Sequence, residues 1–261
     1  MVSKIEIRSL SKSFHGPGMD GGVRALQDVN LDVAEGDFFV ILGPSGCGKS
    51  SLLNVVAGLA GADMGQVLID GKSVSQPNPE KVAMMFQEAV LYPWRSVLRN
   101  VEFGLERRRM APEERRERAV KYLRMVGLEE FARAYPRQLS GGMSQRVSLC
   151  RALAMETEVI LMDEPFGALD EQARVLLGQE LVEIWKQVGK TIVFVTHSVT
   201  EAVSLAERVA IFTARPGRVK RIVEIGLPRP RKGGSADFQN LVELIWAELR
   251  AESMKAIGRG I

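Results

Sequence analysis

Hydrophobic residues follow two different patterns along this chain. Apolar and polar side chains alternate over residues 4–8 and, less strictly, over residues 26–33, which is typical of strands with one buried face. Residues 38–42 and 159–162 are instead continuously apolar, which suits strands that are covered on both faces of a sheet. The N-terminal part is therefore predicted to be rich in half-buried strands, and the remainder to contain a buried parallel sheet.

A charged segment interrupts these strands between about residues 96 and 151. Charges cluster at residues 113–118, just before an apolar stripe at helical spacing formed by Ala119, Leu123 and Val126. We interpret the cluster as the solvated face of an amphipathic helix rather than as a nucleic-acid patch. Beyond this segment, apolar strands alternate with helical stretches, as in a parallel α/β sheet.

The pattern changes again after about Pro216. The sequence Leu-Pro-Arg-Pro-Arg at residues 227–231 breaks regular structure, because proline lacks a backbone donor and restricts the residue before it. Residues 238–254 then have the spacing of an amphipathic helix. We expect a terminal helix after an irregular linker.

The composition is that of a folded globular protein with balanced charge. Of 261 residues, 46% are hydrophobic and 26% are charged, and 35 basic against 32 acidic residues give a net charge of +3. This balance does not favour nucleic-acid binding, which usually involves a concentrated basic surface. Cys47 and Cys150 match neither a disulfide framework nor a metal-ligand spacing, which favours a reducing cytosol. No apolar run approaches the ~20 residues that span a bilayer.

The first chemical motif directly follows the apolar run at residues 38–42 and matches the phosphate-loop pattern G-x-x-x-x-G-K-[ST]. Glycines in such a loop allow backbone N–H groups to surround phosphate oxygens, Lys49 reaches the β- and γ-phosphates, and the Ser50 hydroxyl can bind Mg²⁺. We expect this loop and the residue after it to bind a nucleotide. The residues are Gly43, Pro44, Ser45, Gly46, Cys47, Gly48, Lys49, Ser50 and Ser51.

Cys47 occupies a variable position of this phosphate loop. Convergent N–H groups and the neighbouring Lys49 favour a thiolate, so we expect a reactive thiol whose alkylation blocks nucleotide binding. The alternative is a small residue that only fills space.

The second chemical motif lies where the apolar run at residues 159–162 ends in two carboxylates, Asp163 and Glu164. Nucleotide hydrolysis needs a group near the metal ion and a group that orients or activates the attacking water. We expect Asp163 to meet Mg²⁺ and Glu164 to act as the general base. The alternative for Glu164 is an ordinary surface carboxylate at a strand end.

Six sequence elements occur in the order found in ATP-binding-cassette (ABC) proteins. In chain order they are Phe14, the phosphate loop, Gln87, the signature Leu-Ser-Gly-Gly at residues 139–142, Asp163-Glu164-Pro165, and His197. On these motifs the chain resembles the nucleotide-binding subunit of an ABC transporter over nearly its whole length.

The resemblance implies an α/β fold with three parts. These parts are a P-loop NTPase (RecA-like) core with a parallel sheet, an antiparallel β subdomain and an inserted α-helical subdomain. The implied domains are an ABC ATP-binding domain at residues 1–229, with its helical subdomain at about 90–150, and a C-terminal helical tail at 230–261.

The resemblance also implies a homodimer with two composite sites for ATP and Mg²⁺. One subunit supplies the phosphate loop, Gln87, Asp163, Glu164 and His197, and the other closes the site with Ser140, Gly141 and Gly142. Two adjacent glycines expose their N–H groups, and the following helix presents its positive end.

Individual roles follow from the same resemblance. Gln87 and His197 join Glu164 as catalytic residues, and Gln87 joins Ser50 and Asp163 around Mg²⁺. Phe14 is expected to stack on adenine. The alternatives are a buried strand-end aromatic for Phe14 and a core histidine for His197.

The implied partners are two transmembrane permease subunits and, indirectly, a periplasmic or extracellular substrate-binding protein. The resemblance also implies that this chain is peripheral on the cytoplasmic face of the cell membrane. Tyr92, Trp94 and Arg95 are interpreted as a patch that contacts the permease; the alternative is a set of core aromatics. This loop, Met143 and the turn at 214–218 resemble the nitrate, sulfonate and taurine importer branch. We therefore expect the ATP-hydrolysing subunit of a bacterial importer. The alternatives are an exporter or lipid-transport ATPase and a non-transport ABC ATPase.

Overall fold

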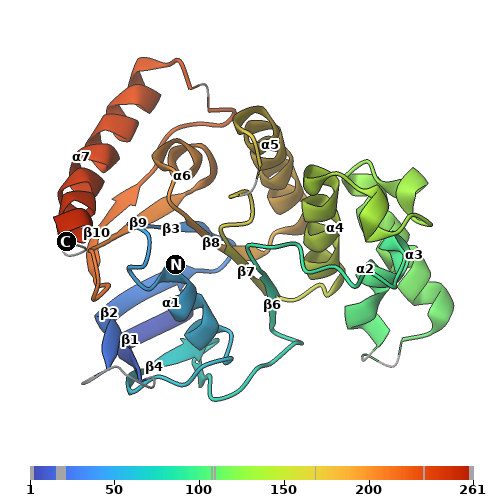
Figure 1. Cartoon of the computed structure of the whole chain (residues 1–261), viewed down its shortest axis with the longest axis horizontal. Coiled ribbons are helices and arrows are strands. Elements are labelled where there is room, and N and C mark those ends of the chain that lie inside the picture. The colour runs from blue at the N-terminus through green and yellow to red at the C-terminus, as the bar shows by residue number, and fades with distance from the viewer. Residues whose placement is uncertain are drawn as a thin grey trace. The chain divides into compact units, whose positions relative to one another are not determined.

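The computed structural model describes residues 3–15, 22–106, 108, 110–167, 169–231 and 233–258. The chain divides into two compact units, one formed by the residues up to Asn78 together with those from Lys190 onward, and the other by Pro79–Gly189. Each unit contains strands and helices of its own (Figure 1). In the described part of the chain, no helix is both long and apolar enough to cross a membrane.

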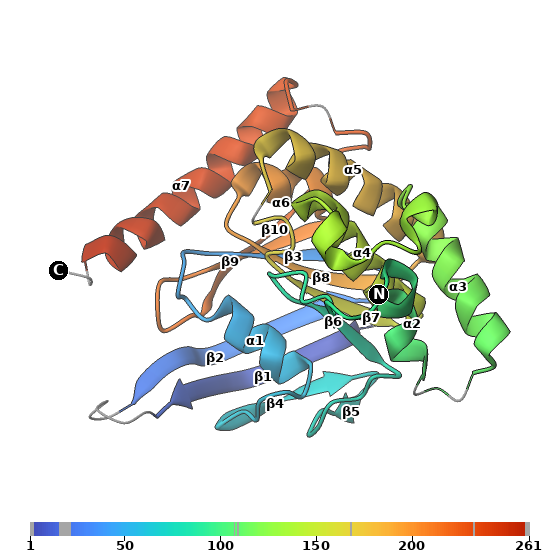
Figure 2. The ribbon, with the colours of Figure 1, turned by 45° about the vertical axis from the view of Figure 1, so that its right-hand side comes forward.

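The first unit contains an antiparallel sheet with the strand order β2-β1-β4-β5 (Figure 2). The strands are β1 (Ser3–Phe14), β2 (Val23–Ala34), β4 (Met64–Ile69) and β5 (Lys72–Ser73). β1 pairs with β2 along most of its length, from Ile5 opposite Val33 to Phe14 opposite Val23. The alternating pattern of the sequence correctly predicted this antiparallel β subdomain.

A second set of strands in the first unit is mainly parallel. It comprises β3 (Phe38–Leu42), β8 (Thr191–Thr196), β9 (Arg208–Phe212) and β10 (Val219–Glu224). β3 pairs in parallel with both β8 and β9, and β10 pairs antiparallel with β9. Every residue of β3 and β8 is buried, as the continuously apolar run at residues 38–42 predicted. The helices α1 (Lys49–Val56) and α6 (Val199–Leu205) follow β3 and β8.

The first unit ends with the long helix α7 (Ala236–Gly258), drawn in red in Figure 1. It packs against α6 and β9, and it buries Phe238, Ile245 and Leu249. The helix predicted at residues 238–254 is therefore present, and its buried apolar face makes it part of the folded unit.

The second unit pairs two parallel strands and carries four α-helices among its described residues. The elements are β6 (Val82–Met85), α2 (Val97–Glu106), α3 (Pro112–Met125), α4 (Gly141–Ala154), β7 (Val159–Asp163) and α5 (Glu171–Val188), with short 3₁₀ turns at Glu129–Phe131 and Pro136–Gln138. α2, α3 and α4 pack against one another. Ala119, Leu123 and Val126 are buried, as their helical spacing predicted. Cys150 is also buried, and burial raises the pKa of its thiol.

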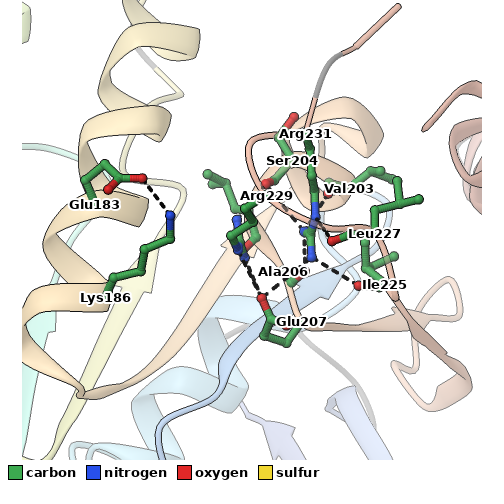
Figure 3. Close-up of polar contacts among 11 residues, drawn as sticks. Glu183, Lys186, Val203, Ser204, Ala206, Glu207, Ile225, Leu227, Arg229 and Arg231 are labelled. Atoms are coloured by element: carbon green, nitrogen blue, oxygen red, sulfur yellow. Dashed lines mark hydrogen bonds and ion pairs between the residues drawn. The ribbon is translucent and has the colours of Figure 1, made fainter. Parts of the chain in front are cut away.

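Arg231 anchors the segment at residues 227–231 to the end of α6. Its guanidinium is buried and donates to backbone carbonyl groups at the end of α6 and after β10 (Figure 3). The acceptors are Ala206 O at 2.5 Å, Val203 O at 2.9 Å, Ile225 O at 3.0 Å, Leu227 O at 3.2 Å and Ser204 O at 3.4 Å. Burial and, to a smaller extent, the positive charge of Arg229 lower the pKa of Arg231 to about 10. Arg231 therefore remains cationic at neutral pH.

Arg229 reinforces the same contact. It donates to Ser204 O at 3.1 Å and to Leu205 O at 2.5 Å, and it pairs with Glu207 at 2.7 Å (Figure 3). Helices end with carbonyl groups that lack intrahelical partners. The two arginines supply these donors, so the segment that the sequence indicated only as a break also caps α6.

We predict that Arg231→Ala lowers the free energy of unfolding by about 3 kcal/mol or more, because several buried carbonyl groups lose their donor. Arg221→Ala is the matched control, since Arg221 is half-exposed and pairs with Glu248 at 2.9 Å. Its cost should stay below about 1 kcal/mol. Urea unfolding followed by circular dichroism measures both variants, and equal losses would contradict the capping role.

Candidate functional site

The phosphate loop connects the buried strand β3 to helix α1. Gly48 is the N-cap of α1 and has a φ of 104°, a conformation that strongly favours glycine. The ammonium of Lys49 donates to Gly43 O at 2.8 Å and to Pro44 O at 3.1 Å, so the side chain lies back along the loop. Ser45, Gly46 and Ser50 are exposed, Gly48 and Ser51 are half-buried, and Gly43, Pro44, Cys47 and Lys49 are buried.

This arrangement suits a phosphate group. The first N–H groups of α1 have no partner within the helix, and the helix dipole places partial positive charge there. The exposed edge of the loop presents small residues and the Ser50 hydroxyl beside those N–H groups. Residues 43–51 are therefore suited to bind an anion.

The side chain of Cys47 does not fit the expectation of a reactive thiol. It is only 1% exposed, and a Cβ built on Gly43 would lie 2.9 Å from its Sγ. Reactive cysteines are partly exposed. The structure therefore favours the space-filling alternative, with Cys47 contributing to the loop through its backbone.

In the second unit, β7 ends at Asp163, and both Asp163 and Glu164 are half-buried. Glu164 has a φ of 43°, which is uncommon for a residue other than glycine. Its carbonyl accepts a hydrogen bond from Gly167 N at 3.0 Å, which closes a turn directly after the strand. A fixed backbone here limits where the Glu164 carboxylate can point.

The side chain of Gln87 lies near this turn. A Cβ built on Gly167 would lie 3.7 Å from Gln87 Nε2 and 3.8 Å from Glu164 Cβ. Gln87 is exposed and directly follows Phe86, after the end of β6. The structure thus brings together two of the predicted catalytic residues, one from each of two parallel strands.

Two side chains of α4 hold the loop after Gln87 in place. Gln145 Nε2 donates to Gln87 O at 2.9 Å, and Arg151 donates to Val90 O at 2.8 Å and to Ala89 O at 3.2 Å. Burial lowers the pKa of Arg151. Sequence reasoning missed both residues, although Gln145 lies three positions beyond the signature and could have been singled out there.

The signature forms the start of α4. Ser140 is the N-cap, and its Oγ accepts a hydrogen bond from Met143 N at 3.2 Å. A Cβ built on Gly141 or Gly142 would meet no atom within 4 Å, and Ser140 and Gly141 are exposed. The signature therefore presents an open helix N-terminus rather than a packed turn.

His197 follows β8 in the first unit and is exposed, so it is not a core histidine. The hydrogen-bonding groups on either side of it fix the backbone. Thr196 Oγ1 accepts from Ser198 N at 3.0 Å and bonds to Glu201, and Ser198 Oγ caps α6 by accepting from Glu201 N at 3.3 Å. This local frame holds the imidazole at the carboxyl end of a buried strand.

Phe14 ends β1 in the first unit and is 44% exposed. The ammonium of Lys12 lies 5.6 Å from the centre of its ring. An exposed aromatic ring can stack on a base. Phe14 is therefore not a buried strand-end residue.

The loop with Tyr92, Trp94 and Arg95 is anchored by the buried Asn100. Its Oδ1 accepts from Tyr92 N at 2.8 Å, and its Nδ2 donates to Arg95 O at 3.0 Å and Tyr92 O at 3.2 Å. Arg95 pairs with Glu106 at 2.6 Å and lies over the ring of Phe103, at 4.8 Å. Trp94 is 72% exposed. Arg95 thus stabilises the loop, and Trp94 is the side chain that projects from it.

The residues proposed for Mg²⁺ have suitable donor atoms. Ser50, Gln87 and Asp163 offer a hydroxyl, an amide and a carboxylate oxygen, which are the hard ligands that Mg²⁺ prefers. The described residues contain no group of three or more His, Cys, Asp or Glu side chains that could hold an ion. Mg²⁺ bound with phosphates typically takes only one or two protein carboxylates, so the donor set fits.

Comparison with known proteins gives the family. The family described as "ABC transporter" matches residues 26–167, which include the phosphate loop, Gln87, the signature and Glu164. An uncharacterized ABC transporter ATP-binding protein of Methanocaldococcus jannaschii is 49% identical over 257 residues, covering 98% of this chain and 95% of that protein. The chain therefore belongs to the ABC transporter family, as an ATP-binding subunit with ATPase activity.

Two further relatives have functional names. The nitrate import ATP-binding protein NrtD of Synechocystis is 44% identical over 224 residues, covering 86% of this chain and 83% of that protein. The aliphatic sulfonates import ATP-binding protein SsuB of Bacillus cereus is 39% identical over 237 residues, covering 91% and 92%.

A solved structure supports the same fold. A dimeric ATP-binding cassette in a post-hydrolysis state, bound to ADP and Pi, is 35% identical and superimposes with a TM-score of 0.76, covering 86% of this chain and 100% of that chain. The predicted P-loop NTPase fold is thereby confirmed.

We predict that Glu164→Gln lowers the ATP turnover number by about 100-fold or more, because the amide keeps the shape of the side chain but cannot accept a proton. ATP binding should persist. Glu171→Gln is the matched control, since Glu171 is an exposed acid in the first turn of α5. Steady-state phosphate release measures both, and near-normal turnover in Glu164→Gln would reject Glu164 as the base.

Proposed function

We propose that this chain is the ATP-hydrolysing subunit of an importer for nitrate, sulfonates, taurine or a related small compound. It acts as a homodimer that binds two ATP molecules between its subunits and drives two permease subunits through closing and reopening. The chain is peripheral on the cytoplasmic face of the cell membrane. A substrate-binding protein outside the membrane delivers the cargo to the permease.

The open signature is the observation that carries this proposal. Ser140 and Gly141 are exposed at the start of α4, and the space around Gly141 and Gly142 is open, which suits this helix N-terminus to bind phosphate oxygens. A second copy of the chain can supply the phosphates that these groups would bind. A related cassette is dimeric when bound to ADP and Pi, which supports a homodimer here.

We assign each residue a role in this cycle. The loop N–H groups and Lys49 bind the β- and γ-phosphates. Ser50, Asp163 and Gln87 would hold Mg²⁺, which would supply positive charge to neutralise the phosphate oxygens. Glu164 accepts the proton of the attacking water, and His197 bonds the γ-phosphate from the end of β8. Phe14 stacks on the adenine.

The importer branch is supported by relatives and by the loop at residues 91–95. NrtD and SsuB are named as import proteins for nitrate and for aliphatic sulfonates. In this chain the loop displays Trp94 on a base fixed by Asn100 and Arg95. An exposed aromatic on a rigid base is well suited to anchor a protein partner. The cargo itself meets only the partners.

The cargo class is tested with the complete complex, reconstituted in vesicles with its own permease and binding protein. We predict that nitrate or an organosulfonate stimulates ATP hydrolysis and is taken up. Coupled transport requires that the cargo-loaded binding protein outside the membrane favours the closed dimer, in which ATP is hydrolysed. Stimulation by a metal, sugar or peptide ligand alone would contradict the assignment.

We predict that Trp94→Ala weakens permease binding by about tenfold or more while leaving ATP affinity and folding unchanged, because the side chain projects from the loop. Trp246→Ala is a matched control, since Trp246 is also exposed, at 52%, but lies on α7. Co-purification and uptake report docking. Normal assembly of Trp94→Ala with the permease would rule out this anchor.

A further inference from the structure

The turn at residues 213–218 holds the phosphate loop from behind, and it contains the segment 214–218 that resembles the importer branch. This turn connects β9 to β10. A Cβ built on Gly217 would lie 2.2 Å from Cys47 O, so the backbone of the turn lies directly against the phosphate loop. Only glycine allows so close an approach.

Backbone hydrogen bonds tie the same turn to β2. Gly217 N donates to Ala25 O at 2.8 Å, and Gly217 O accepts from Gln27 N at 3.0 Å. Ala25 in turn lies against Gly48 of the phosphate loop, since a Cβ built there would be 2.7 Å from Ala25 O. The turn, β2 and the phosphate loop therefore form one packed layer.

The turn is closed by its own polar contacts. Thr213 N donates to Arg218 O at 3.0 Å, and Thr213 Oγ1 accepts from Arg218 N at 3.0 Å and donates to Pro216 O at 3.0 Å. Because both ends of the turn are fixed to each other, a displacement of one end is transmitted to Gly217.

Glu252 of the C-terminal helix fixes the first end. This buried carboxylate accepts a hydrogen bond from Ala214 N at 3.1 Å and pairs with Lys255 at 2.9 Å and Lys220 at 3.4 Å. Burial alone would raise the pKa of Glu252, but the bonds from Lys255 and Ala214 outweigh it and hold the pKa below the usual value. Glu252 is therefore an anion at neutral pH.

We propose that Glu252 is a positioning residue for nucleotide binding: through Ala214 and the turn at residues 213–218, the C-terminal helix α7 holds the phosphate loop in the form that accepts ATP. The inference rests on the proposed function, because it assigns a role toward the ATP bound at this loop. Glu252 does not touch the nucleotide. It lies outside the region that matches the family, residues 26–167.

The test compares Glu252→Ala with Glu248→Ala in the full chain. Glu248 lies one turn earlier on α7, and its carboxylate pairs with Lys220 and Arg221 of β10. We expect Glu252→Ala to raise the Kd for MgATP by about tenfold, from the loss of a buried charged hydrogen bond, and Glu248→Ala to change it by less than about twofold. Isothermal titration measures Kd, and circular dichroism confirms folding.

Two further variants keep the test decisive if Glu252→Ala does not fold. Glu252→Gln keeps an oxygen that can accept from Ala214 N, so its Kd should lie between those of wild type and Glu252→Ala. Gly217→Ala places a methyl group against Cys47 O and should weaken MgATP binding by about tenfold or more.

Amide hydrogen exchange separates positioning from a general loss of stability. In Glu252→Ala, exchange should accelerate at residues 45–51, and in Glu248→Ala it should not. If a folded Glu252→Ala or Gly217→Ala variant bound MgATP with wild-type affinity, the positioning role of Glu252 would be overturned, but the proposed function would not. A wild-type protein that binds no MgATP would instead refute the proposed function together with it.

Discussion

The phosphate loop imposes the constraint on which the rest of the first unit depends. A loop that binds phosphate through its backbone N–H groups cannot commit those groups to the regular hydrogen bonds of a strand or a helix. Its support comes from the opposite side, where Ala25 lies against Gly48 and Gly217 against Cys47 O. β3 and α1 fix its two ends. The buried strands thus fix the backbone conformation of the phosphate loop, a short irregular segment.

The residues proposed for the site are divided between the two compact units. The phosphate loop, His197 and Phe14 belong to one unit, whereas Gln87, Asp163, Glu164 and the signature belong to the other. Within the second unit, Gln145 and Arg151 join the signature helix to the loop after Gln87. These bonds couple the signature helix to the backbone of Gln87, which is proposed to bind Mg²⁺, and this coupling suits a site that forms only on ATP binding.

The sequence predicted the features that have a local pattern. The buried runs at β3 and β7 and the apolar stripe of residues 119, 123 and 126 are short-range signals, and the structure confirms them. The sequence did not predict the structural roles of Arg231, Gln145 and Glu252. Their partners are backbone groups of distant segments, and such contacts leave no periodicity in the sequence. Cys47 was predicted to be reactive from its neighbours in sequence, and burial beneath Gly43 and against the 213–218 turn contradicts this.

Trapping of ATP in mixed dimers tests most directly the claim that each site is completed by a second copy. One dimer carries Ser140→Arg in one subunit and Lys49→Ala in the other, and the comparison dimer carries both changes in a single subunit paired with an otherwise unchanged one. With Glu164→Gln in every subunit, the account predicts about one trapped ATP per dimer in the first arrangement and none in the second. Equal amounts of trapped ATP in the two arrangements would contradict it.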